Sequence, residues 1–104
     1  MKKKGKKPSP VTSKPFLRFE SPVEEEVDLH GLAIDEAMVQ AELAIARWKK
    51  HPGACIRFIH GKSSGNQNSI KGALRRNLET AWKHAVRSFR PELANPGATL
   101  VSLL

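Results

Sequence analysis

A short apolar run at residues 55–59 ends in His60 and Gly61, and a loop of lysine, serine and glycine follows it. The run is rich in bulky side chains and predicts a largely buried strand. A helical period begins near Ser69, after the loop. A strand that enters a Gly/Ser loop and then a helix is a common phosphate-binding arrangement, because the loop N–H groups and the helix N-terminus carry partial positive charge. Many α/β loops contain glycine and lysine, so this run alone is weak evidence for a phosphate site. It becomes informative only together with a second motif elsewhere in the chain.

The periodicity of apolar residues predicts an α/β domain. Strands are predicted at 23–29, 54–59, 86–89 and 99–104, a helix at about 69–84, and an irregular connection with two prolines at 90–97. A first helix is predicted between Gly31 and Pro52, with Arg47, Lys49 and Lys50 in its last turn. The first helix carries a single apolar stripe that we assign to the core: Ile34, Met38, Ala41, Ile45 and Trp48. The order β-α-β-α-β-β favours a mostly parallel sheet with right-handed helical crossovers.

The 104 residues leave room for one domain. Residues 1–19 are rich in lysine and proline and poor in large apolar groups, so they cannot bury enough surface to offset their ordering entropy. We therefore predict a disordered basic arm at 1–19 and a folded domain at 20–104. The arm either touches nucleic acid non-specifically or serves only as a solubilising tail.

The net charge of +8 is unevenly distributed. Residues 1–19 hold seven cations and no acid, residues 20–46 hold eight acids and no cation, and residues 47–90 hold eleven cations against Glu79 alone. This polarity favours a polyanionic partner. The alternative is that the acidic and basic segments face one another in the fold and cancel.

A single cysteine, Cys55, excludes an internal disulfide and suits a buried position in its strand. No apolar run approaches the length of a membrane span, and the basic N-terminus lacks the apolar segment of a signal peptide. The sequence therefore predicts a soluble protein of the cytoplasm that does not enter a membrane.

A second motif resembles the strand ending His60-Gly61. It is Asp28-Leu29-His30-Gly31, at the end of the first predicted strand. If the first two strands are adjacent and parallel, both endings leave the sheet at its carboxyl edge, where α/β sheets bind ligands. Asp28, His30, His60 and Lys62 would then converge. Histidines can transfer protons during phosphodiester cleavage, and lysine with backbone N–H groups can stabilise the charged phosphorane. The alternative is that both histidines are structural residues at strand ends.

Two histidines and one carboxylate could also form a metal site. The second loop offers no further acidic ligand, so the ligand spacing gives magnesium no support and no cofactor is identifiable.

The segments Val27-Asp28-Leu29-His30-Gly31, Ile59-His60-Gly61-Lys62 and Gly97-Ala98-Thr99-Leu100-Val101 resemble the Smr (small MutS-related) domain over about residues 23–104. The resemblance implies a fold similar to the C-terminal domain of bacterial translation initiation factor three, with a four-stranded mixed sheet and two helices. It also implies nucleic-acid binding and, in several members, DNA nicking or RNA cleavage. It links Asp28 and His30 to cleavage and the second motif to substrate binding.

This chain departs from the family pattern at Ser63, where the second motif has its second glycine. A serine resists positive φ and brings a side chain close to a bound phosphate. The sequence thus predicts an RNA- or DNA-cleaving endonuclease; the alternative is a non-catalytic module that binds nucleic acid or the ribosome. The residues assigned to catalysis are Asp28, His30 and His60, and those assigned to nucleic-acid binding are Gly31, Gly61, Lys62, Ser63, Ser64, Gly65, Lys71, Arg75 and Arg76.

Overall fold

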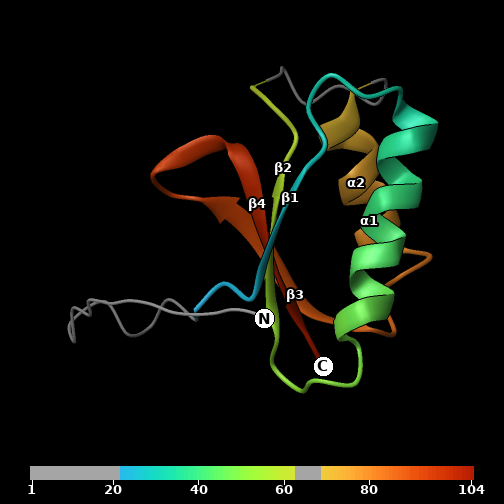
Figure 1. Cartoon of the computed structure of the whole chain (residues 1–104), viewed down its shortest axis with the longest axis vertical. Coiled ribbons are helices and arrows are strands. Elements are labelled where there is room, and N and C mark those ends of the chain that lie inside the picture. The colour runs from blue at the N-terminus through green and yellow to red at the C-terminus, as the bar shows by residue number, and fades with distance from the viewer. Residues whose placement is uncertain (1–21, 63–68) are drawn as a thin grey trace.

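The computed structural model describes residues 22–62 and 69–104. In these two stretches the element order is β-α-β-α-β-β, as the sequence predicts, with four strands in one mixed sheet and two helices (Figure 1). The bounds are β1 Glu25–Asp28, α1 Ile34–Trp48, β2 Cys55–Ile59, α2 Ile70–Glu79, β3 Val86–Glu92 and β4 Asn95–Leu103. The predicted arm at 1–19 lies outside the described residues.

The sheet has the strand order β1-β2-β4-β3, so β1 and β3 are its edges. Only β1 and β2 are parallel, while β4 runs antiparallel to both of its neighbours. The prediction of a mostly parallel sheet is therefore wrong. Just two residues, 93 and 94, separate β3 from β4, and so short a connection can join only antiparallel strands.

The segment predicted as an irregular connection is instead the hairpin of β3 and β4. Pro91 lies within β3 and pairs with Thr99 of β4. A proline lacks the N–H that a central strand must donate, but an edge strand tolerates it. Because β3 is an edge, its proline does not interrupt the sheet.

Helix α2 ends at Glu79 and not near residue 84 as predicted. The hydroxyl of Thr80 donates to the carbonyl of Arg76 at 2.7 Å, and the N–H of Thr80 donates to the carbonyl of Asn77 at 3.2 Å. These bonds close the last turn of the helix. Trp82 is nevertheless buried, because the turn after α2 returns it to the core.

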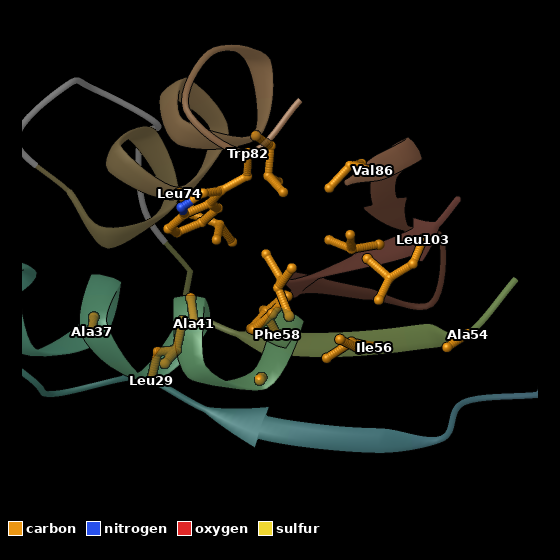
Figure 2. Close-up of a cluster of buried hydrophobic side chains, with 14 residues drawn as sticks. Leu29, Ala37, Ala41, Ala54, Ile56, Phe58, Leu74, Trp82, Val86 and Leu103 are labelled. Atoms are coloured by element: carbon orange, nitrogen blue, oxygen red, sulfur yellow. The ribbon is translucent and has the colours of Figure 1, made fainter. Parts of the chain in front are cut away.

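Both helices cover the same face of the sheet (Figure 1). Their apolar side chains form one core with those of the strands (Figure 2). Phe58 and Ile56 of β2 are fully buried there, and small residues of α1, such as Ala37 and Ala41, allow close approach of the helix to the sheet. Burial of a side chain such as Phe58 contributes roughly 1.5–3 kcal/mol. Cys55 is buried as well, as predicted. Neither described helix is long and apolar enough to cross a membrane.

Candidate nucleic-acid site at two strand ends

The carboxyl ends of β1 and β2 lie side by side. Asp28 is in register with Ile59, and the N–H of Leu29 donates to the carbonyl of Ile59 at 2.7 Å. A Cβ built on Gly61 would lie 3.5 Å from the Cβ of His30. The two His-Gly turns are therefore neighbours at one edge of the sheet, as the spacing of the two motifs predicts.

The first turn holds a hydrogen-bonded pair of Asp28 and His30. One carboxylate oxygen of Asp28, Oδ1, accepts from the backbone N–H of His30 at 3.1 Å and lies 2.5 Å from its ring nitrogen Nδ1. The N–H of Leu32 donates to the carbonyl of Leu29, and Gly31 has the positive φ of 81° that the third position of a type II turn requires. A short local sequence thus fixes the imidazole against the carboxylate.

The pair lies on the surface, with 66% of the His30 side chain and 56% of the Asp28 side chain exposed. The hydrogen bonds from the His30 ring and backbone hold the pKa of Asp28 below its ordinary value. An ionised carboxylate can only accept hydrogen bonds, so Nδ1 of His30 carries the proton of this contact. The pair uses Nδ1 and leaves Nε2 for a ligand, which is the arrangement of an oriented general base.

The second turn holds His60 in the opposite way. His60 is only 6% exposed, and its Nδ1–H donates to the carbonyl of Gly61 at 2.9 Å while Nε2 accepts from the hydroxyl of Thr99 at 2.8 Å. Burial lowers the pKa of His60, and the charge of Lys71 lowers it further against the contrary effect of the Gly61 carbonyl. His60 is therefore neutral, and both ring nitrogens have partners inside the protein.

The two imidazoles point to opposite faces of the sheet. Thr99 is in register with Phe58, whose side chain is in the core beneath the helices. Asp28 alternates with Val27 and Leu29, which pack in that same core, so the carboxylate of Asp28 lies on the face opposite the helices. The structure thus brings Asp28 and His30 together but does not bring the His60 ring to them.

Gly97 packs the second turn against β4. Its carbonyl accepts from the N–H groups of His60 and Gly61, at 2.9 and 3.0 Å. A Cβ on Gly97 would lie 3.3 Å from the Gly61 carbonyl carbon and the Lys62 nitrogen, which is closer than most real contacts allow. The N–H of Gly61 therefore donates within the protein and is not free to bind a phosphate. Gly61 contributes to the turn by adopting a positive φ of 88°.

Of the other predicted binding residues, Lys62 follows the second turn and is exposed. Lys71, Arg75 and Arg76 lie on α2. The hydroxyl of Ser69 caps the N-terminus of this helix by accepting from the N–H of Gly72 at 3.0 Å. Ser63, Ser64 and Gly65 lie outside the described residues. Sequence reasoning gave no role to Thr99 or Gly97; their function depends on contacts with residues 60–62, far away in the chain.

Two acids of the acidic segment, Glu25 and Glu26, form ion pairs with arginines of the basic segment. Glu25 binds Arg47 at 2.7 Å, and Arg57 joins Glu26 at 2.9 Å to Glu92 at 2.5 Å. Burial works to raise the pKa of Glu25, but the hydrogen bonds from Arg47 and Trp48 outweigh it and the pKa is lowered. Part of the charge polarity is thus cancelled internally, as the alternative interpretation of the sequence predicts.

The residues that the structure describes include no cluster of three or more His, Cys, Asp or Glu side chains that could hold a metal ion. The Asp28–His30 pair by itself supplies two ligand groups. The described side chains therefore provide no basis for assigning a metal to this site.

Comparison with known proteins agrees with this architecture. The family model of the Smr domain matches residues 27–103. The crystal structure of the Smr domain of Thermus thermophilus MutS2 is similar, with a TM-score of 0.58 and 29% sequence identity over 77% of this chain and 98% of that chain. No curated protein sequence matches this chain. The chain belongs to the Smr domain family, which is known in general for nucleic-acid binding and nuclease activity.

Proposed function

We propose that this protein is a nucleic-acid endonuclease that cleaves RNA or nicks DNA with the Asp28–His30 pair. The observation that carries the proposal is the 2.5 Å contact between Asp28 Oδ1 and His30 Nδ1 on an exposed turn. The turn adjoins Gly61 and the exposed Lys62, so a phosphate beside the imidazole would also lie near a fixed positive charge.

In this mechanism the Nε2 atom of His30 accepts the proton of the attacking oxygen, which is the 2′-hydroxyl in RNA or a water molecule in DNA. The new oxygen–phosphorus bond forms as the phosphorus–oxygen bond to the leaving group breaks. The leaving oxygen takes a proton from solvent or from the imidazolium. Asp28 holds the ring in the required tautomer and stabilises the imidazolium.

His60 acts in this scheme as a positioning residue. Its ring is buried and bonded to Gly61 and Thr99, so it holds the second turn in place beside His30. Lys62 binds phosphate as a point charge, because a lysine ammonium does not act as a base near neutral pH unless its pKa is strongly shifted.

The first test measures single-turnover cleavage of end-labelled RNA and DNA, with and without EDTA. We expect His30→Ala to lower the rate by about 10²-fold or more while binding stays near wild type. Lys62→Ala should weaken binding, with most of the cleavage recovered at saturating nucleic acid. His84→Ala removes another exposed histidine, away from the site, and is the matched control.

The outcomes separate a catalyst from a binder. Loss of cleavage in His30→Ala but not in His84→Ala supports the endonuclease. A wild-type protein that binds RNA and DNA but cuts neither, with His30→Ala affecting only binding, would instead establish the non-catalytic module that binds nucleic acid or the ribosome.

A further inference from the structure

A groove runs between α2 and the edge strand β3. The groove has two hollows. The first, which we call its upper part, encloses about 190 Å³ and is lined by Lys71, Leu74, Arg75, Leu78, Phe89, Pro91 and Thr99. A second hollow shares Leu78 and Phe89 with the first and continues past Glu79, Lys83 and Arg87. The upper part is smaller than the roughly 300–1,000 Å³ of pockets for whole small-molecule ligands. It has room for a single flat ring.

The rim of this α2–β3 groove is strongly positive. Four cations line the two hollows (Lys71, Arg75, Lys83 and Arg87), against the single carboxylate of Glu79. Glu79 lies 3.7 Å from Arg75 and neutralises part of that charge. Lys71 and Arg75 are like charges four residues apart on one helix, which costs roughly 0.2–0.5 kcal/mol of helix stability. An anion in the groove would offset this repulsion.

The position of Arg87 follows from an irregularity in β3. The register between β3 and β4 shifts between Val86 and Ser88, so Arg87 is the extra residue of a bulge. Bulges re-aim side chains at sheet edges, and here Arg87 lines the groove together with Phe89. Basic residues on an edge strand also discourage pairing with other strands. That explanation does not apply to Lys71 and Arg75, which lie on α2.

The floor of the groove is apolar and offers a flat ring. Phe89 is only partly buried, and Pro91 beside it is exposed. An aromatic ring in a positively charged groove is how proteins bind single-stranded nucleic acid, because every base has a face that can stack. A duplex hides those faces between its own base pairs.

The upper part of the groove lies at the same end of the sheet as the proposed cleavage site, but on the face that the helices cover. Thr99 lines this upper part, and its hydroxyl donates to Nε2 of His60. The next residue after His60 is Gly61, which lies beside His30. The charge of Lys71 acts on the same His60. A nucleic-acid strand bound there would lie at the end of the sheet where Gly61 and Lys62 also lie.

We propose that the α2–β3 groove is a second binding site for single-stranded nucleic acid, with a base stacked on Phe89 and phosphates on the rim cations. This inference rests on the proposed endonuclease function and assigns to its substrate a single-stranded stretch. The charge of the rim and the ring on the floor favour this occupant over an acidic protein segment, which would have no use for a stacking surface.

The test measures binding of a fluorescent single-stranded oligonucleotide and of its duplex across a range of salt concentrations. We expect Lys83→Gln with Arg87→Gln to weaken single-strand binding by about 5–10-fold and to reduce the log–log salt slope by roughly 1.4, at about 0.7 per lost contact. The matched control is Lys49→Gln with Lys50→Gln, which removes the same charge from exposed positions after α1 and should change binding less than twofold.

A second variant tests stacking. Phe89→Leu keeps an apolar side chain against the core but removes the ring, and should weaken single-strand binding on the order of tenfold while duplex binding is unchanged. A 4-thiouridine oligonucleotide should cross-link to the tryptic peptide that contains Phe89. Circular dichroism of each variant verifies that it is folded.

Three results would overturn the inference, and they are distinguishable. If wild type binds no nucleic acid, both the proposed function and the groove site fail. If wild type binds but the groove variants behave like the Lys49/Lys50 control, the groove site alone fails. If a polyglutamate peptide binds with dependence on Lys83 and Arg87 while the oligonucleotide does not, the groove receives an acidic protein segment.

Discussion

The two His-Gly turns are near copies in sequence and opposites in structure. His30 is exposed and held by a carboxylate two residues before it, whereas His60 is buried and held by a threonine 39 residues away in the chain. The glycine that follows each histidine has a positive φ, 81° in Gly31 and 88° in Gly61. The same dipeptide thus presents an exposed ring at one strand end and anchors a turn at the other, because the neighbours of each ring differ.

The largest expected difference between the turns is in stability. His60→Ala removes a buried ring and leaves the Gly61 carbonyl and the Thr99 hydroxyl without their partner, which should lower the free energy of unfolding by roughly 2–4 kcal/mol. His30→Ala changes an exposed side chain and should lower it by less than about 0.5 kcal/mol. Urea denaturation of both variants measures this. Equal losses would mean that the two histidines have similar structural roles.

A smaller effect is expected from the glycines. Gly97→Ala places a Cβ against the backbone of Gly61 and Lys62 and should cost about 1–2 kcal/mol of stability through overpacking. Amide NMR shifts of residues 60–62 should move. Gly31→Ala is the control, because its Cβ meets no atom within 4 Å and only its positive φ is strained, at a cost of roughly 1 kcal/mol. Unmoved shifts at residues 60–62 in Gly97→Ala would show that β4 does not position the second turn.

The smallest effect is a pH dependence of stability that belongs to the second turn. Burial lowers the pKa of His60, so below about pH 6.5 the unfolded chain binds more protons than the folded protein. The stability from a neutral His60 is therefore complete above that pH and is lost as the pH falls toward the lowered pKa. Denaturation between pH 7 and pH 5 should show a shallower decline in His60→Gln than in wild type.

Asp28 contributes to stability over a different pH range from His60. Its pKa is lowered by His30, so its contribution is present above the ordinary pKa of an aspartate, near 4, and is lost only as the pH falls through the lowered value. Asp28→Asn should therefore leave the decline between pH 7 and pH 5 unchanged. If His60→Gln and wild type lose stability in parallel over that range, His60 is not held neutral by the fold.

The sequence determined the features that arise from residues close together in the chain. The element order follows from local apolar periodicity, and the Asp28–His30 pair follows from two residues in one turn whose hydrogen bonds need no distant partner. The adjacency of the two strand ends was also predictable, since a strand-helix-strand unit places parallel neighbours at one edge.

Only the tertiary structure decided where β4 lies and what it contacts. The hairpin of β3 and β4 inserts β4 beside β2, and this brings Thr99 to His60 and Gly97 to Gly61. The direction of the His60 ring and the α2–β3 groove depend on these long-range contacts. Two identical dipeptides cannot specify them, because the side of the sheet on which a ring is buried is set by residues that reach it only when the chain has folded.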